Sequence, residues 1–378
     1  MKKITYLGIR VVSKIVKKLH ISPVELANII CLIPHKKLRI TSEDITNARK
    51  YLNSIKTDPD NSAICEDRQI KNEYDLQIII PAYNVEKYID GCMESAIAAQ
   101  RGPYKILITC VNDGSTDSTP ILLEKYKGLK DLEIIHQSNK GLSGARNRAL
   151  ENIRAKYVTF LDSDDEIGDI NALLSEAVKH NADIAEGSFE RFNDKFCSIH
   201  RERNINSDNR AHGILYGFPW GKIYKSVLFS NLKFPESYWF EDTINALVLF
   251  HLAKKVITRD IICYRYRINP QGISRTSIGN TKSLDTHWIT ERLIKDRKTL
   301  GIKNQHTQDC ETFAEQIKIN YLRICSLQNK ELDKAFFSLC YELFMRYFHE
   351  DSKSNNPIII ALSNGDFFKF KALSLLTL

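Results

Sequence analysis

The chain contains 378 residues, of which 26% are charged and 43% are hydrophobic. This balance is typical of globular proteins, and it excludes collagen-like, low-complexity and wholly disordered chains. At roughly 150 residues per domain, the length predicts two to three domains. Lys and Arg together number 54 and Asp and Glu number 46, which gives a net charge of +8.

The whole excess of positive charge lies in residues 1–40, which hold nine basic residues and one acidic residue. The remainder of the chain has balanced charge, so we predict no nucleic-acid partner. Residues 4–19 place apolar side chains at three- and four-residue spacing, which predicts a basic amphipathic helix. Such a helix either packs on the body of the protein or lies on an anionic membrane, and the pattern leaves both interpretations open.

The sequence also bears on the compartment. Its nine cysteines form no CxxC pair and no cluster with the spacing of zinc ligands, which indicates reduced thiols. No apolar run reaches the roughly 18 residues that a membrane-spanning helix needs, and no clear secretion signal is present. We therefore predict a cytoplasmic protein. Peripheral contact with the inner face of the membrane through residues 1–40 is a further hypothesis.

Along the chain, a polar segment at 57–74 predicts a linker, and short apolar strands then alternate with helices. The predicted elements are strand 76–80, helix 86–100, strand 104–111, helix 118–126, strand 133–136, helix 143–153, strand 157–161 and helix 169–179. This alternation predicts an α/β fold, with a mostly parallel central sheet covered by helices. The segment 281–378 predicts mainly helices, so we divide the chain into regions 1–74, 75–280 and 281–378.

Polar motifs follow three of the predicted strands, where parallel sheets bind their ligands. They are Pro81-Ala82-Tyr83-Asn84, Asn112-Asp113-Gly114-Ser115-Thr116-Asp117 and Asp162-Ser163-Asp164-Asp165. Three carboxylates within four residues repel one another unless a cation intervenes, and their hard oxygen ligands suit Mg²⁺ or Mn²⁺. The alternative is a helix N-cap, which needs only one acid. Asp113 is either part of an ordinary turn or an acceptor for a ribose or base.

The sequence lacks the motifs of several other classes of nucleotide-binding protein. No GxGxxG follows the first strand, which disfavours a nicotinamide or flavin site, and no GxxxxGK[ST] supports a P-loop. A nucleotidyltransferase would need a glycine-rich loop directly after the first strand, and Pro81-Ala82-Tyr83-Asn84 is not such a loop.

Four segments in order resemble the nucleotide-binding half of family 2 glycosyltransferases, which have the GT-A fold. They are IIIPAYNVEKYIDGCMESAIAAQ, VNDGSTDST, NKGLSGARNRAL and YVTFLDSDDEI. Three later segments are similar to the acceptor half of bacterial polysaccharide-building members, namely PWGKIYKSVLF, FPESYWFEDT and YRYRINPQGISR. The resemblance covers residues 75–278.

The resemblance implies roles by position. It assigns the donor nucleotide to Pro81, Ala82, Tyr83, Asn84, Asp113, Arg146 and Asp162, with Tyr83 near the uracil and Arg146 near the diphosphate. It assigns the divalent metal, Mg²⁺ or Mn²⁺, to Asp164 and Asp162, with Asp165 as an alternative ligand. Asp242 would be the general base, although the pair Glu241-Asp242 could instead cap a helix predicted at 243–253.

The implied function is metal-dependent, inverting transfer of a sugar from a nucleotide donor, most simply UDP-linked. The acceptor would be a hydroxyl of a saccharide, lipid-linked or protein-linked glycan at the cell surface. The alternative is a non-catalytic module of the same fold, which would lack a metal or base carboxylate. Arg265, Arg267 and Arg275 either clamp a diphosphate or are surface charges. Trp220, Tyr238 and Trp239 either stack on an acceptor sugar or pack in the core.

Overall fold

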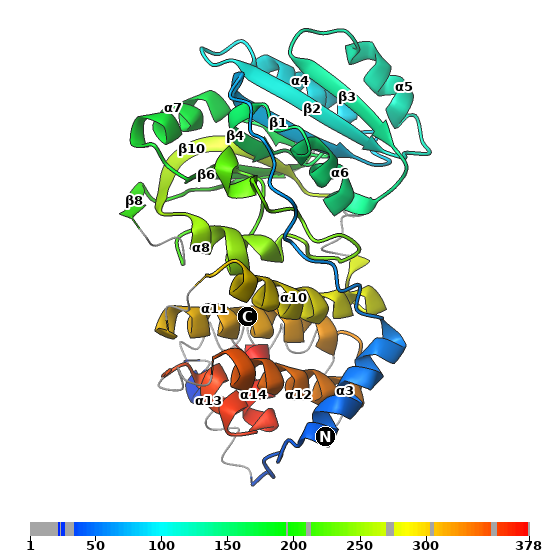
Figure 1. The fold of residues 1–378 in the computed structure, drawn as a ribbon, viewed down its shortest axis with the longest axis vertical. Coiled ribbons are helices and arrows are strands. Elements are labelled where there is room, and N and C mark those ends of the chain that lie inside the picture. The colour runs from blue at the N-terminus through cyan, green and yellow to red at the C-terminus, as the bar shows by residue number, and fades with distance from the viewer. Residues whose placement is uncertain are drawn as a thin grey trace. The chain divides into compact units, whose positions relative to one another are not determined.

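The computed structural model describes residues 22, 24–26, 34–193, 196–208, 213–269, 276–302, 306–348 and 354–376. The predicted helix 4–19 and Arg275 lie outside the described residues. The chain divides into two compact units, each drawn in Figure 1. The sheet unit comprises Asn61–Ser237 and Glu241–Pro270, and the helical unit comprises Met1–Asp60, Tyr238–Phe240 and Gln271–Leu378.

In the described residues, one sheet contains strands in the order β3-β2-β1-β4-β9-β6-β10-β5, with β7 paired to β6 and β8 paired to β10. The strands are β1 Tyr74–Ala82, β2 Ile106–Asp113, β3 Leu132–Gln137, β4 Ala155–Phe160, β5 Glu166–Ile167, β6 Ile184–Asn193, β7 Phe196–His200, β8 Ile205–Asp208, β9 Lys222–Lys225 and β10 Lys255–Arg267.

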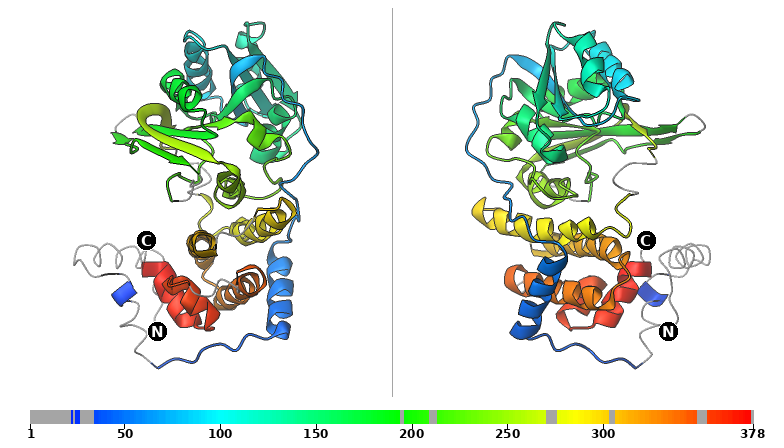
Figure 2. Two further views of the ribbon diagram at one scale, coloured as in Figure 1. Left: turned by 60° about the vertical axis from the view of Figure 1, so that its left-hand side comes forward. Right: turned by 90° about the vertical axis from the view of Figure 1, so that its right-hand side faces the viewer.

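The first four strands run parallel, as the alternation of strands and helices predicted. Beyond β4 the sheet becomes mixed, because β9 runs antiparallel to both β4 and β6. The long strand β10 then pairs in parallel with β6, and its course beside β6 can be followed in Figure 2. The parallel half supplies the strand ends that carry the predicted donor motifs.

Pro81 and Ala82 belong to β1 itself, so this strand is longer than predicted. Pro81 is opposite Val111 of β2, while pairing of β1 with β4 extends only to Ile79 opposite Phe160. The N–H that proline lacks would face the β4 side, beyond the end of that ladder. A proline is therefore tolerated in a central strand without loss of a sheet hydrogen bond.

The helices and shorter helical turns of the sheet unit are α4 Ile89–Ala99, α5 Thr119–Leu123, η1 Glu124–Tyr126, α6 Gly141–Leu150, α7 Ile170–His180, η2 Ser226–Phe229, η3 Asn245–Leu249 and α8 Phe250–Leu252. One core cluster joins the apolar faces of α4 and α7 to alternate residues of β1 and β2, including Leu76, Ile78 and Ile80. Alternation along a strand places these three side chains on one face of the sheet. The predicted helices are thus confirmed, with ends shifted by a few residues.

The predicted linker differs from expectation, because its second half lies along the sheet unit. The N–H groups of Cys65 and Arg68 donate to the carbonyls of Asn231 and Ser230, at 2.9 and 2.7 Å. The Arg68 guanidinium also donates to the Phe229 carbonyl at 2.9 Å. Polar composition alone could not show this, since the partners are backbone carbonyls distant in sequence.

The helical unit contains α3 Ser42–Ile55, η4 Thr281–Leu284, α10 Asp285–Thr299, α11 His306–Cys325, α12 Lys330–Tyr347, α13 Pro357–Ser363 and α14 Phe367–Leu376. The helical content predicted for the C-terminal region is therefore confirmed. Helix α3 joins these helices through Arg49, which donates to Glu291 at 2.9 Å and to Glu342 at 2.7 Å. Parts of the two ends of the chain thus share one unit.

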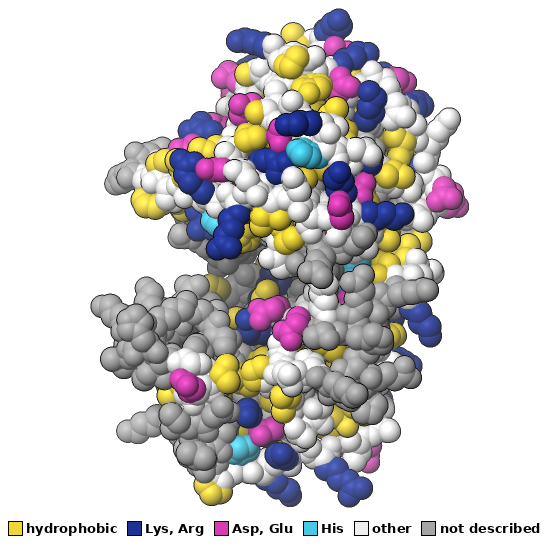
Figure 3. All heavy atoms as spheres, turned by 90° about the vertical axis from the view of Figure 1, so that its left-hand side faces the viewer, with side chains coloured by type: hydrophobic (Ala, Val, Ile, Leu, Met, Phe, Trp, Pro, Cys, Tyr) yellow, Lys and Arg dark blue, Asp and Glu magenta, His cyan; other side chains and the backbone are white. Residues whose placement is uncertain are grey.

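A search of the described residues finds no helix that is both long enough and apolar enough to span a membrane. On the face shown in Figure 3, Lys and Arg side chains lie among Asp and Glu side chains. This mixture agrees with the balanced charge of residues 41–378.

Candidate functional site

The loop after β1 presents Tyr83, whose side chain is 48% exposed. The next residue, Asn84, has φ of 50°, a left-handed conformation that Asn adopts more readily than most residues. The Asn84 N–H donates to Ser115 Oγ at 3.0 Å, and Asn84 Oδ1 accepts from the Thr116 N–H at 2.8 Å. These bonds tie the loop after β1 to the loop after β2, so the first two predicted donor motifs lie together.

Asp113 lies at the end of β2 and is only 2% exposed. Its Oδ1 accepts from Gln137 Nε2 at 2.7 Å and from the Lys140 N–H at 2.8 Å. The following residue, Gly114, has φ of 70°, and a Cβ there would lie 2.7 Å from Asn139 N. Asp113 therefore anchors the loop after β3. Both bonds use Oδ1, so Oδ2 is the oxygen that could accept from a nucleotide, and that role stays a prediction.

The acid loop, residues 162–166, follows β4, and its carboxylates differ in environment. Asp165 is 2% exposed, and its Oδ2 and Oδ1 accept from the Tyr264 hydroxyl and the Arg267 N–H, both at 2.6 Å. Burial, with the neighbouring charges of Asp164 and Asp162, raises the pKa of Asp165 well above its ordinary value. Asp165 is therefore an internal anchor of the loop, whereas the Asp162 side chain keeps 27% exposure.

The end of β10 holds the rest of the acid loop. Arg267 Nε donates to the Asp164 carbonyl at 2.9 Å, and its Nη2 donates to Glu166 Oε1 at 2.7 Å. Asn269 Nδ2 donates to Asp164 Oδ2 at 2.8 Å, and Arg265 also pairs with Glu166. Arg265 and Arg267 are thus engaged with acids of this loop, and the predicted contact with a diphosphate stays a prediction.

The acid loop offers donors that suit a divalent cation. Burial, followed by the charge of Asp162, raises the pKa of Asp164. A cation would relieve this repulsion, and the described hydrogen bonds of Asp162 and Asp164 use one oxygen each, Oδ1 and Oδ2 respectively. Among the described residues, no three His, Cys, Asp or Glu side chains converge as a complete metal-binding group. Asp162 and Asp164 therefore suit a divalent metal ion that takes most of its ligands from other sources, such as diphosphate oxygens and water.

Arg146 of α6 connects the acid loop to the segment of the predicted base. Its guanidinium is 1% exposed and donates to Asp162 Oδ1 at 2.7 Å and to Glu241 Oε1 at 2.6 Å. The guanidinium also lies over the rings of Phe160 and Phe234, at 5.9 and 5.2 Å from their centroids. The paired carboxylates raise the pKa of Arg146 against the effect of burial. The observed contacts of Arg146 are with acids, and its approach to a diphosphate stays a prediction.

Glu241 is buried and Asp242, the predicted base, is partly exposed. Burial raises the pKa of Glu241, and the charge of Arg146 opposes that shift. The preceding residue, Phe240, has φ of 65°, which is strained for a bulky side chain and is found where surrounding structure imposes it. The predicted helix 243–253 contains a π-helical turn, η3, a feature frequent at functional sites.

Sequence reasoning missed Tyr264 and Asn269, and it singled out Arg267 and Glu241 without predicting the partners that the structure gives them. Tyr264, Arg267 and Asn269 hold the acid loop, and Glu241 receives Arg146. Their partners lie about 100 positions away in the chain, and no local pattern reports such contacts. The odd-numbered series 265, 267 and 269 in an extended segment is the signal that could have placed three polar side chains on one face.

The three aromatic residues proposed as a stacking wall do not share one environment. Trp220 belongs to the sheet unit, is 7% exposed and stacks on Tyr264 with 4.6 Å between ring centroids. Tyr238 and Trp239 belong to the helical unit, where the Tyr238 hydroxyl donates to Asp58 Oδ1 at 3.0 Å. The core interpretation therefore describes Trp220 and Tyr238.

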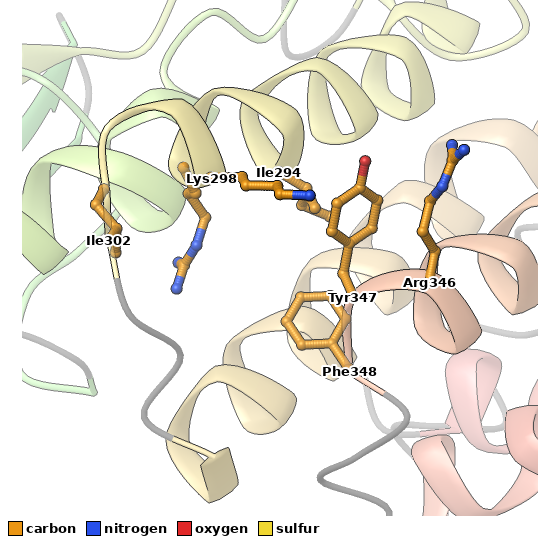
Figure 4. Close-up of a pocket in the computed structure, with 7 residues that line it drawn as sticks. Ile294, Lys298, Ile302, Arg346, Tyr347 and Phe348 are labelled. Atoms are coloured by element: carbon orange, nitrogen blue, oxygen red, sulfur yellow. The ribbon is translucent and has the colours of Figure 1, made fainter.

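A separate cavity of about 490 Å³ lies in the helical unit (Figure 4). Its lining residues are Ile294, Arg297, Lys298, Ile302, Arg346, Tyr347 and Phe348. Arg297 is already paired with Asp309 at 2.7 Å. None of the predicted site residues lines this cavity, so we place the candidate site in the sheet unit.

The parallel half-sheet, with its polar strand ends and its acid loop, is that of a GT-A-like fold. Residues 77–240 match the family model of glycosyl transferase family 2, as the resemblance in the sequence predicted. The chain is 33% identical over 221 residues to glycosyltransferase GlyA of Streptococcus pneumoniae, a match that covers 53% of this chain and 31% of GlyA.

Two further comparisons extend past the matched domain. The minor teichoic acid biosynthesis protein GgaB of Bacillus subtilis is 28% identical over 327 residues, which covers 80% of this chain and 35% of GgaB. Residues 1–349 of S. aureus TarS, solved in complex with UDP-GlcNAc, superpose with a TM-score of 0.61 and 18% identity, covering 79% of this chain and 90% of that one. The chain spans less than half of the length of either curated relative, and the likeness to TarS shows the fold.

Proposed function

We propose that the protein transfers a sugar from a nucleotide donor to a glycan hydroxyl, with inversion of the anomeric centre and with help from a divalent metal. Residues 75–280 would carry the chemistry. The observation that supports this most is the pair of ion pairs made by Arg146, which joins Asp162 of the acid loop to Glu241, the neighbour of Asp242. Arg146 thereby joins two segments about 80 residues apart in sequence, one with a predicted metal ligand and the other with the predicted base.

In this reaction the acceptor hydroxyl oxygen attacks the anomeric carbon, and its proton passes to the Asp242 carboxylate. The bond between the anomeric carbon and the diphosphate oxygen breaks, and the diphosphate leaves with the bonding electrons. A divalent metal held by Asp164 and Asp162 would supply positive charge to the leaving diphosphate. Tyr83 and Asn84 would border the base, and Asp113 would accept from the base or ribose.

The donor and acceptor classes follow from the relatives and are part of this proposal. TarS shares the fold and was solved with UDP-GlcNAc, and GgaB is named for teichoic acid biosynthesis. We therefore expect a UDP-sugar donor and a cell-surface polysaccharide or glycoconjugate acceptor. Release of UDP from UDP-GlcNAc, UDP-glucose and UDP-galactose, with Mn²⁺ or Mg²⁺ and glycan acceptors, tests this. Binding of UDP with no release from any donor would favour the non-catalytic alternative.

Replacing Asp164 with Ala should remove metal-dependent donor binding, because Asp164 supplies the carboxylate we assign to the metal. We expect UDP affinity in the presence of Mn²⁺ to fall to its value in EDTA, measured by calorimetry. Asp67→Ala is the matched control, since Asp67 is an exposed aspartate of the same unit. UDP affinity that still rises on adding Mn²⁺ to Asp164→Ala would remove this residue from the metal site.

For residues 1–40 we propose contact with anionic lipid at the cytoplasmic face of a membrane, supported by their nine basic residues and one acid. The full chain should pellet with phosphatidylglycerol vesicles at low salt more than a chain lacking residues 1–40. Phosphatidylcholine vesicles serve as the control. Equal pelleting of both chains with anionic vesicles would reject the contact.

A further inference from the structure

A row of aromatic rings, which we call the aromatic ladder, runs through Tyr216, Phe218, Trp220 and Tyr264. The planes of Tyr216 and Phe218 differ by 6°, and those of Phe218 and Trp220 by 3°. The ring centroids are 6.3 Å apart in the first pair and 4.6 Å apart in the second. Three rings from positions 216, 218 and 220 therefore lie in nearly parallel planes.

The inner end of the ladder touches the acid loop. Trp220 stacks on Tyr264 at 15° and 4.6 Å. The Tyr264 hydroxyl donates to Asp165 Oδ2 at 2.6 Å and accepts from the Asp162 N–H at 3.2 Å. The ladder therefore leads outward from the proposed donor site, one ring at a time.

Exposure rises along the ladder, from 1% at Tyr264 and 7% at Trp220 to 41% at Tyr216. Two other rings meet Tyr216 nearly at right angles, Phe189 at 87° and His200 at 89°. Phe189 and His200 contact part of the Tyr216 ring, and the 41% exposure shows that another part is open to solvent. An aromatic side chain that is partly open to solvent therefore lies at the outer end of the ladder.

A buried ion pair fixes the outer rungs. Glu186 and Lys222 pair at 2.5 Å with side chains 4% and 1% exposed. Glu186 accepts from the Tyr216 N–H at 3.2 Å, and Lys222 Nζ donates to the Phe218 carbonyl at 2.8 Å. Removing two charges from water costs free energy, so a buried ion pair needs further hydrogen bonds. Here Glu186 and Lys222 make those bonds to the backbone of Tyr216 and Phe218. An exposed ring held this firmly loses little entropy when a ligand packs on it.

We propose that Tyr216 and Phe218 form a subsite for a pyranose ring of the glycan acceptor. This subsite rests on the proposed function, and it specifies which part of the acceptor the protein would bind. The apolar C–H face of a pyranose packs on an aromatic face, and its hydroxyls need polar neighbours. His200 lies 4.9 Å from Tyr216 between ring centroids, and Arg191 lies over Phe189, which also contacts Tyr216, so groups that can hydrogen-bond hydroxyls lie near this ring.

The test compares Tyr216→Ala, Tyr216→Phe and the control Val227→Ala, which truncates a 58% exposed apolar side chain elsewhere on the sheet unit. Saturation-transfer NMR and titration use cellopentaose, maltopentaose, chitopentaose and β-1,4-galactopentaose. We expect the wild type to bind at least one of these, and Tyr216→Ala to weaken that binding by about fivefold to tenfold. Tyr216→Phe and Val227→Ala should bind as the wild type does.

UDP binding with Mn²⁺ is measured on every variant and should not change. A wild type that binds no UDP would contradict the proposed function instead of the subsite. Retained UDP binding together with equal oligosaccharide binding by Tyr216→Ala, or with no binding of any of the four sugars by the wild type, would overturn the subsite. Phe218→Leu keeps apolar volume, and it should weaken sugar binding less than Tyr216→Ala does.

Discussion

Asp242→Asn should abolish sugar transfer while UDP binding with Mn²⁺ persists. Asn keeps the size and hydrogen-bonding capacity of the side chain but cannot take the proton of the acceptor hydroxyl. General base catalysis contributes about 10²- to 10⁴-fold in rate, so we expect a loss in this range. Release of UDP with acceptor present measures the rate, and calorimetry measures UDP affinity.

Two control variants separate the loss of the Asp242 carboxylate from a general disturbance of the structure around it. Glu241→Gln alters the buried neighbour that accepts from Arg146, and it should disturb stability more than Asp242→Asn does. Asp242→Glu keeps a carboxylate and should recover part of the rate that Asp242→Asn loses. Full transfer activity in Asp242→Asn would exclude this residue as the base.

Arg146→Met should destabilise the sheet unit by about 3–5 kcal/mol, the usual cost of removing one partner from a buried ion pair. The substitution keeps a long side chain in contact with Phe160 and Phe234 but leaves Glu241 buried without its guanidinium. Urea unfolding followed by fluorescence measures the free energy of unfolding.

Arg148→Met is the matched control for Arg146→Met. Arg148 lies on the same helix, is 46% exposed and pairs with the exposed Glu151. Exposed pairs contribute about 0–1 kcal/mol, so the control should lose little. The double variant Arg146→Met with Glu241→Gln should recover part of the loss, because it no longer buries an unpaired carboxylate. Equal stability of Arg146→Met and Arg148→Met would contradict the role of Arg146 as a buried connector.

The alternation of strands and helices was readable because it is local. Hydrophobic period and turn residues predicted α4, α6, α7 and the four parallel strands, to within a few residues at their ends. The order of the polar motifs also predicted the family, which the match over residues 77–240 confirms. Local patterns did not predict that the sheet becomes mixed beyond β4, since antiparallel pairing of β9 depends on a long return of the chain.

Within the candidate site, sequence determined which acids occur but not how each is used. Asp162, Asp164 and Asp165 are the same residue type and are close in sequence. In the structure both carboxylate oxygens of Asp165 accept hydrogen bonds from Tyr264 and Arg267, while Asp162 remains partly exposed. The reason is that burial and partners, which set the availability of a carboxylate, come from β10 about 100 residues later.

The sequence by itself determined the class of fold, the family that residues 77–240 match and the polar motifs at the strand ends, because periodicity and motif order are properties of neighbouring residues. Only the tertiary structure decided that Arg146 connects Asp162 to Glu241 and that Tyr216 stands exposed at the end of an aromatic ladder. The place of Tyr216 depends on Phe189 and His200, which come from strands β6 and β7. The place of Arg146 depends on side chains far apart in sequence that meet in a buried, low-dielectric interior. In such an interior an unpaired charge costs several kcal/mol or more, so the guanidinium is held where carboxylates can pair with it.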